Sequence, residues 1–245
     1  MDRSTLDQIV QDKAAGRPVV LAKNLASGHN VLVYPFEKTE RSPLLEAARE
    51  AAVNDRSASV TAADGTWFLQ VFNPPLRMIL IGAVHISQPL ARMAVMAGYA
   101  VTIVDPRRAF ATEDRFPGLT VTTDWPDEAM TKLKPNRRTA VVALTHDPKL
   151  DDPALLVALK SDAFYIGALG SSKTHAKRKD RMLAAGFSEA TFHRIRGPVG
   201  LKIGARSPAE IAVSVLAEVI AALHEQSGSL VAPRDASTLP ESQVA

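Results

Sequence analysis

The chain contains no cysteine among its 245 residues. This absence excludes disulfides, zinc–thiolate sites and iron–sulfur ligation, and the chain cannot itself carry a persulfide. No apolar run approaches the roughly 20 residues that a membrane-spanning helix needs. The stretch MDRSTLDQIV also lacks the apolar core of a signal peptide. We therefore expect a cytoplasmic protein with no membrane partner.

The chain has no strong excess of positive or negative charge: its formal net charge is +3 and its pI is near 9.2. This is too little for a committed nucleic-acid binder, but it suits an anionic small ligand or an acidic partner. Histidines and carboxylates do not recur at metal-ligand spacing, so no metal site is expected. A hydrophobic content of 46% is ordinary for a globular protein of one large or two modest domains.

Two different patterns divide the chain, with Asn73-Pro74-Pro75 as the break between them. Residues 1–73 alternate short strands and helices, which predicts a small α+β N-terminal domain. Residues 74–225 repeat strand and helix in strict alternation with near-continuous apolar strands, which predicts an α/β, Rossmann-like parallel sheet covered on both faces. Residues 226–245 are polar and aperiodic, and they predict a flexible tail.

The expected elements follow from periodicity and from start signals. In the first 73 residues, Ser4 is the expected N-cap of a helix, Ser42 caps a second helix, and Asp64-Gly65 joins a hairpin. Strands are then expected near 77–82, 100–105, 119–123, 138–145 and 163–167. Helices are expected near 86–97, 126–133, 152–160, 174–185 and 208–224.

The segment RMILIGAVHISQPLARMAVMAGYAVTIVDPR has the order of the first half of a Rossmann unit. A dinucleotide-binding turn reads G-x-G-x-x-G, and here Gly82, Val84 and Ser87 occupy the three glycine positions. The branched side chain of Val84 stands where a pyrophosphate would approach the backbone. The helix N-terminus still offers amides to an anion. We therefore expect this turn to hold a phosphate, but to disfavour NAD(P) in its usual pose.

Polar residues follow both strands of this unit. His85 comes after the turn, where it either bonds a neighbouring carbonyl or faces the ligand crevice. Asp105 ends the second strand, close to the spacing of about 20 residues that places a ribose-binding acid. Two hypotheses stay open for Asp105 and Arg107: a carboxylate paired with an arginine, or a polar rim that contacts sugar and phosphate.

The strand AVVALT leads into a second polar cluster at the same edge of the sheet. There, His146 and Asp147 are candidates for an acid–base or ligand-orienting pair. Asp151 and Asp152 precede Pro153, so one of them is the expected N-cap of the next helix.

A second glycine turn, GALGSSK, opens a helix. Gly170 permits a tight turn, Ser171 and Ser172 supply hydroxyls, and Lys173 adds a cation at the helix N-terminus. The order differs from a Walker A loop. We expect these four residues to form an anion-binding corner.

Basic residues continue along this helix, because Lys173, Lys177 and Arg181 recur at four-residue steps. The pattern indicates either a solvated face or a surface for ligand phosphates or an acidic partner. Gly200 lies in the loop GPVGLKIGARSP, which either brings backbone near a ligand or another chain, or is only an elaborate turn.

Five segments together resemble the XdhC/CoxI family of molybdenum-cofactor maturation factors: PPLRMILIGAVHI, VTIVDPRRAFATEDRFP, ALTHDPKLDDPALL, YIGALGSSKTHAKR and GPVGLKIGARSPAEIAVSVLAE. The resemblance covers about residues 74 to 224. This chain departs from the family at Val84, where G-A-G-H is usual, and at Lys202, where an acidic residue is common. Residues 1–73 match the family's N-terminal domain poorly.

The resemblance implies a chaperone, without turnover or catalytic residues of its own, that binds molybdenum cofactor as molybdopterin or its dinucleotide form. It implies two partners, a cysteine desulfurase that sulfurates the cofactor and the large subunit of an apo-molybdoenzyme of the xanthine or carbon monoxide dehydrogenase type. A homodimer is compatible with this role, and no nucleic-acid partner is expected. The candidate cofactor contacts are Gly82, Val84, His85, Asp105, Arg107, His146, Asp147, Gly170, Ser171, Ser172, Lys173 and Gly200.

Two alternatives belong to other classes. An NAD(P)-dependent oxidoreductase would share the crossover at Gly82, but Val84 and the lack of a recognisable hydride-transfer constellation argue against it. A degenerate family member would bind no small molecule and would act as a scaffold through its basic helix.

Overall fold

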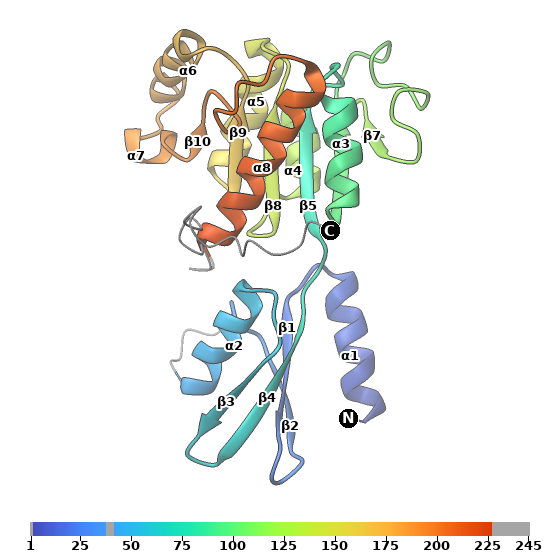
Figure 1. Cartoon of the computed structure of the whole chain (residues 1–245), viewed down its shortest axis with the longest axis vertical. Coiled ribbons are helices and arrows are strands. Elements are labelled where there is room, and N and C mark those ends of the chain that lie inside the picture. Colours follow the sequence, from blue (N-terminus) through green and yellow to red (C-terminus); the bar gives the residue numbers. More distant parts are fainter. Residues whose placement is uncertain (1, 38–41, 227–245) are drawn as a thin grey trace, which may run out of the picture.

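The structure, a computed structural model, describes residues 2–37 and 42–226. Figure 1 shows an antiparallel four-stranded sheet with two helices below a parallel six-stranded sheet flanked by helices. The predicted class, a Rossmann-like sheet preceded by a small α+β unit, is therefore confirmed. The domain limits 1–73, 74–225 and 226–245 stay predictions, and the expected tail lies outside the described residues from position 227 on.

The N-terminal unit has the strand order β2-β1-β4-β3. Its elements are α1 (Arg3–Ala14), β1 (Val19–Asn24), β2 (Asn30–Val33), α2 (Pro43–Val53), β3 (Ala58–Ala62) and β4 (Gly65–Phe72). Side chains of a strand alternate between its faces. Val19 and Leu21 accordingly pack with Ile9 of α1, whereas Val20 and Ala22 pack on α2. The two helices thus cover opposite faces of β1.

The start of α1 differs from the expected one. Asp2 is the N-cap, because its carboxylate accepts a hydrogen bond from the amide of Thr5, while Ser4 lies inside the helix and its hydroxyl also donates to Asp2. The prediction of Ser4 as the cap is therefore wrong. Ser42 caps α2 as predicted, with Pro43 in the first turn.

The parallel sheet has the order β10-β9-β8-β5-β6-β7. Its strands are β5 (Leu76–Ile81), β6 (Tyr99–Val104), β7 (Thr120–Thr122), β8 (Thr139–Ala143), β9 (Tyr165–Ala168) and β10 (Ile195–Arg196). The chain proceeds from β5 outward to β7 and then returns to place β8 on the other side of β5. The strand order therefore reverses between β5 and β8, and crevices at the carboxyl ends of such strands are where α/β sheets bind ligands.

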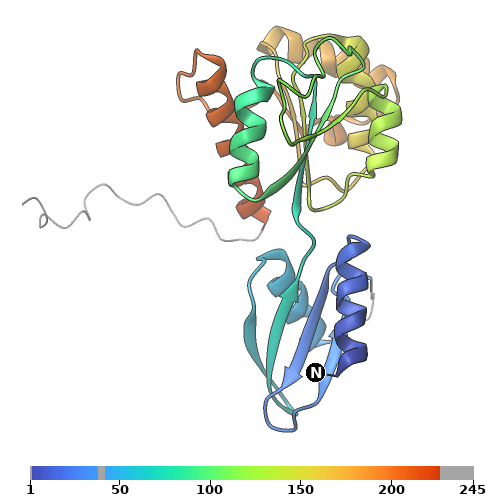
Figure 2. The ribbon, with the colours of Figure 1, turned by 90° about the vertical axis from the view of Figure 1, so that its right-hand side faces the viewer.

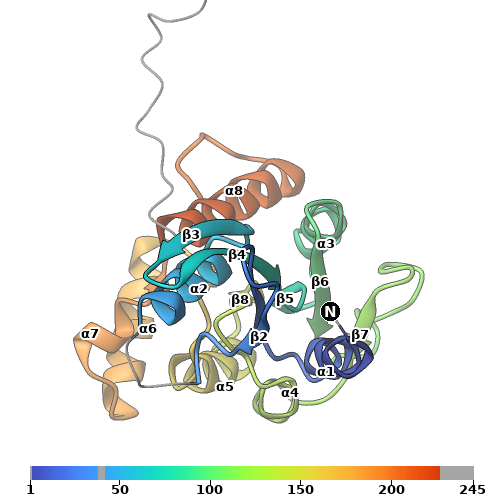
Figure 3. The same ribbon diagram turned by 90° about the horizontal axis from the view of Figure 1, so that it is seen from below.

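Helices cover both faces of this sheet (Figures 2 and 3). They are α3 (Ser87–Met96), α4 (Pro126–Leu133), α5 (Pro148–Leu159), α6 (Ser172–Ala184), α7 (Glu189–Phe192) and α8 (Pro208–Gln226). Met78 and Leu80 of β5 share one buried cluster with α3 and α8. Ile79 and Ile81 point the other way, into a cluster with α4, α5 and α6. A central strand buried on both faces explains the continuous apolar run.

Periodicity located the long elements, and the largest error in a helix start falls at α5. Helix α5 begins at Pro148 instead of near residue 152, and Asp147 caps it by accepting the amide hydrogen of Lys149. The expectation that Asp151 or Asp152 is the cap is wrong, since both lie within the helix together with Pro153. The short elements α7 and β10 escaped prediction because four and two residues carry no periodicity.

None of the helices in the described ranges combines the length and the apolar character needed to cross a bilayer.

Candidate functional site

The loops after β5 and β8 lie side by side where the strand order reverses. Gly82 has a φ of +106°, and a Cβ added there would clash with the Cγ2 methyl of Thr145. The glycine is therefore required by the close approach of the neighbouring strand end. The hydroxyl of Ser87, at the start of α3, donates to the Gly82 carbonyl and fixes the turn.

Asp105 ends β6 beside this turn and is fully buried, at 0% exposure. Its two oxygens accept four hydrogen bonds, from the amides of Ala83 (2.7 Å) and Arg107 (2.9 Å) and from two guanidinium nitrogens of Arg107 (2.9 and 2.7 Å). Burial alone raises the pKa of Asp105, but the bonds from Arg107 and Ala83 outweigh it and hold the pKa below its ordinary value. Of the two hypotheses for Asp105 and Arg107, the structure shows the first, a carboxylate paired with an arginine.

Val84 and His85 occupy the outer part of the same turn. The Val84 side chain is half-buried and packs against the hydrophobic cluster under α3, so part of it points inward. His85 is exposed at the carboxyl edge of the sheet. Their contact with a ligand stays a prediction.

The loop after β8 is built around Asp151, which is buried at 1% exposure and is one of the two residues considered as the helix cap. Its carboxylate accepts hydrogen bonds from the Thr145 hydroxyl (2.7 Å) and amide (3.2 Å) and from the His146 amide (3.1 Å). His146 has a φ of +64°, a left-handed conformation that costs a non-glycine residue about 1 kcal/mol or more. Asp151 therefore holds the exposed His146 in place.

Asp147 has a local structural role in this loop, and its pairing with His146 as an acid–base or ligand-orienting pair stays a prediction. Its side chain accepts the Lys149 amide at 2.9 Å and caps α5. A carboxylate in this position is also stabilised by the positive end of the helix dipole.

The turn GALGSSK leads into α6 two residues earlier than predicted. Ser171 is the N-cap and accepts the amide hydrogen of Thr174 at 3.2 Å. Gly170 has a φ of +139°, and an added Cβ would lie 3.0 Å from Thr174. Ser171, Ser172 and Lys173 are exposed at the helix start.

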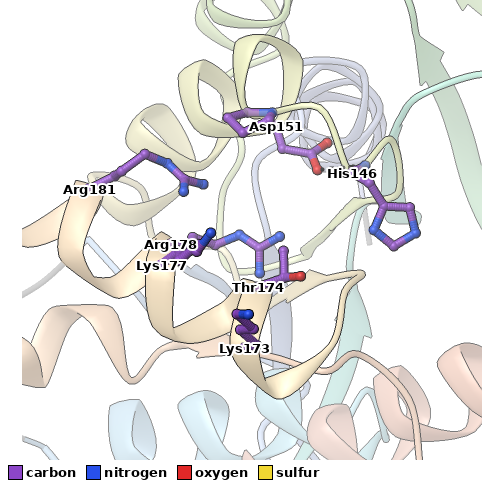
Figure 4. Close-up of a pocket in the computed structure, with 8 residues that line it drawn as sticks. His146, Asp151, Lys173, Thr174, Lys177, Arg178 and Arg181 are labelled. Carbon is purple, nitrogen blue, oxygen red and sulfur yellow. Dashed lines mark hydrogen bonds between the residues drawn. The ribbon is translucent and has the colours of Figure 1, made fainter.

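These two loops meet at a pocket of about 180 Å³ between the start of α5 and one face of α6. Figure 4 shows its basic side chains on α6 opposite Asp151 and His146. The lining residues are His146, Pro148, Asp151, Lys173, Thr174, Lys177, Arg178 and Arg181. His146 and Lys173, predicted from separate motifs, are thus brought to one cavity.

Arg178 lies at the base of this pocket and is only 2% exposed. Its Nη2 donates to the carbonyl of Leu169 at 2.9 Å, and its Nη1 lies 3.4 Å from Nδ1 of His175. Burial lowers the pKa of Arg178, and the nearby charges of Asp151 and Asp152 oppose that shift. Arg178 was not among the predicted site residues, although its four-residue spacing from Thr174 and Met182 places it on the inward face of α6.

The other cations of α6 differ in their partners. Arg181 forms a two-point ion pair with Asp152 of α5, and Lys179 pairs with Glu189 at 2.9 Å. Within the described ranges, no carboxylate lies within ion-pair distance of Lys173 or Lys177. The predicted basic face therefore reduces to two unpaired lysines at the mouth of the pocket.

Gly200 lies away from the pocket and contacts α8. Its amide donates to Glu218 at 2.8 Å, and an added Cβ would clash with the Ser214 hydroxyl. The hydroxyl of Tyr165 donates to the same carboxylate. The structure thus accounts for Gly200 by packing, and a ligand contact there stays a prediction.

A parallel sheet that is covered by helices on both faces, and whose strand order reverses between β5 and β8, defines a Rossmann-type domain. Residues 78–219 match the XdhC Rossmann domain family. The chain belongs to this family.

Two curated relatives agree with this assignment. A Bacillus subtilis protein described as a probable subunit of xanthine dehydrogenase is 36% identical over 154 residues, which cover 62% of this chain and 44% of that protein. The molybdenum cofactor insertion chaperone PaoD of Escherichia coli is 33% identical over 163 residues, covering 66% of this chain and 45% of that protein. The chain therefore spans less than half the length of either relative.

The fold is also similar to that of a solved structure. A crystal structure described as a xanthine dehydrogenase from Bacillus halodurans aligns with a TM-score of 0.64 at 23% identity. The alignment covers 97% of this chain and 67% of the other. At this identity the likeness supports the fold alone.

Proposed function

We propose that this chain binds molybdenum cofactor and inserts it into an apo-molybdoenzyme of the xanthine dehydrogenase type. The observation that carries the proposal is the pocket between α5 and α6, whose cations exceed the carboxylates around it. It is supported by the relatives, one described as a molybdenum cofactor insertion chaperone and one as part of a xanthine dehydrogenase.

The chemistry of the donor set fits such a ligand. Molybdopterin ends in a phosphate, and its dinucleotide form contains a pyrophosphate, so either form presents an anion. Lys173, Lys177 and Arg178 supply cations, and Thr174 supplies a hydroxyl. The edge formed by Gly82, Val84, His85 and the Asp105–Arg107 pair is the proposed surface for the rest of the ligand.

The proposed partners follow from what the chain lacks. With no cysteine, it has no thiol to relay sulfur, so sulfuration of bound cofactor requires a separate cysteine desulfurase. Delivery requires the large subunit of the client enzyme. We propose a homodimer as the assembly that carries the cargo, to be tested by light scattering.

Two observations weigh against the alternatives. A nicotinamide dinucleotide in the usual pose would need Asp105 to accept ribose hydroxyls, but its oxygens already accept four hydrogen bonds. A scaffold that binds no small molecule would have no use for Arg178 buried in a cavity.

The deciding experiment is to purify the chain from cells that make molybdenum cofactor and to analyse its bound pterin by oxidation, fluorescence and mass spectrometry. We expect a pterin in the preparation, and reconstitution of an apo-molybdoenzyme when the loaded chain is added. Protein from cells blocked in pterin synthesis is the control. A bound nicotinamide, or failure to activate the apo-enzyme despite a bound pterin, would contradict the proposal.

A further inference from the structure

Arg178 is a buried cation whose hydrogen-bonding capacity is only partly used. A guanidinium has five N–H donors. Of these, one bonds the Leu169 carbonyl and one approaches His175 at the longer distance of 3.4 Å. The Nε atom is buried and has no hydrogen-bond partner within the described part of the chain. A buried charge left in this state costs several kcal/mol unless an anion satisfies it.

No side chain in the described residues supplies that anion by direct contact. Asp151 faces the same pocket, but its oxygens already accept from Thr145 and His146, and no ion pair joins it to Arg178. Asp152 is held by Arg181. If the charge of Asp151 is counted as balancing Arg178, and that of Asp152 as balancing Arg181, the two lysines at the mouth still leave two positive charges unbalanced.

We propose that this pocket is a phosphate-monoester site in which Arg178 is the buried anchor. Lys173 and Lys177, at the rim, supply the positive charge that balances the phosphate, and the Thr174 hydroxyl is a further hydrogen-bond donor. A phosphate monoester carries close to two negative charges at neutral pH, which matches the two uncompensated cations. Arginine suits the anchor position because its planar fork bonds two phosphate oxygens at once.

The size of the pocket limits what enters it. At about 180 Å³ it is smaller than the roughly 300–1,000 Å³ of sites that enclose a whole small-molecule ligand. It holds a phosphate, and the body of the ligand lies outside. This deepens the proposed function, on which the identification of the ligand's body rests, whereas the phosphate site is testable without any pterin.

The test uses inorganic phosphate as the probe and the thermal unfolding of the full chain as the readout. Phosphate is titrated against chloride at constant ionic strength, so that general screening cancels. For the wild-type chain we expect the Tm to rise by roughly 5–11 °C when phosphate reaches about 100 times its Kd.

Two substitutions on α6 form a matched pair, since each removes one positive charge. Arg178→Met should abolish the phosphate-dependent rise, because the anchor is lost. Lys179→Met should keep it, because Lys179 pairs with Glu189 outside the pocket. If Arg178→Met does not fold, Lys173→Ala combined with Lys177→Ala alters only exposed side chains and should weaken phosphate binding at least about 10-fold.

The proposal is overturned if phosphate raises the Tm of the wild-type chain no more than chloride does. It is equally overturned if Arg178→Met, or the double lysine variant where Arg178→Met fails to fold, responds as the wild type does. The outcomes also separate this site from the proposed function. Pterin bound without a phosphate effect would sink the phosphate site alone, and an Arg178-dependent phosphate effect without pterin would sink the chaperone alone.

Discussion

Arg107 holds the carboxylate of Asp105 at two points, with its Nε 2.9 Å from one oxygen and its Nη2 2.7 Å from the other. The same carboxylate accepts the amide of Ala83 at 2.7 Å and so ties β6 to the turn that follows β5. An acid at the ribose-binding position is therefore used inside the protein to brace the glycine turn. The crossover has its Rossmann form with Val84 at the middle glycine position.

The first prediction concerns pH, because the folded pKa of Asp105 lies below the ordinary 3.8. The stability from its charged form is fully present above pH 3.8 and is lost as the pH falls through the lower, folded value. Asp105→Asn lacks this titration. We expect it to cost about 2–3 kcal/mol at neutral pH, and the difference from wild type should shrink below pH 3.8 in urea denaturation at a series of pH values.

A suitable control for this variant is Asp124→Asn. Asp124 pairs with Lys132 at the surface, so solvent screening makes the loss small. Equal effects of the two substitutions, or a penalty for Asp105→Asn that is the same at every pH, would contradict the role assigned to the buried pair.

The second prediction separates the two acids near the start of α5. Asp147→Ala removes the N-cap and should cost about 1 kcal/mol. Asp151→Ala leaves the Thr145 hydroxyl and two amides without their acceptor and frees the left-handed His146, so it should cost about 2–3 kcal/mol. Chemical denaturation measures both. A larger loss for Asp147→Ala would show that the cap, and not the buried carboxylate, stabilises this loop.

Periodicity was enough to predict the parallel sheet, and the strand ends were enough to predict the edge on which the candidate residues lie. The buried run of β5 and the amphipathic pattern of α3 are local signals, so their positions came within a residue of the structure. The pocket required partners from distant parts of the chain. The role of Asp151 depends on where β8 ends relative to β5, and a start at Asp147 is no weaker a local signal than one at Asp151. The packing of the β8 end against β5 therefore determines where α5 begins.

Arg178 shows a second limit of the sequence. In a run of basic residues, charge alone does not tell which side chain points inward. The helical phase does, because Arg178 stands four residues before the buried Met182. The four-residue spacing to Met182 would therefore have distinguished the buried Arg178 from the solvated cations of the same helix.

The third prediction concerns Val84. Val84→Gly removes a half-buried side chain and adds backbone freedom, so it should lower stability by roughly 1 kcal/mol. The same change opens the turn to a ligand that crosses it. We expect retained pterin to increase while phosphate affinity stays unchanged, because Val84 does not line the pocket. Calorimetric titrations with each ligand measure this, and unchanged pterin affinity would mean that the ligand avoids the turn.

The last prediction concerns the proposed client enzyme. Reversing Arg181 would break its ion pair with Asp152, so a clean test of the basic face uses Lys177, which is exposed and has no carboxylate partner among the described residues. Lys177→Glu should slow association with the apo-molybdoenzyme about 10-fold at low salt, and the effect should fade as salt screens the charges. Lys179→Glu makes the same change of net charge on the same helix outside the pocket, and because it also breaks the pair with Glu189, its Tm is measured beside its association rate. Biosensor association rates decide the matter: equal slowing by both variants would indicate long-range charge, and none by Lys177→Glu would remove this face from the docking surface.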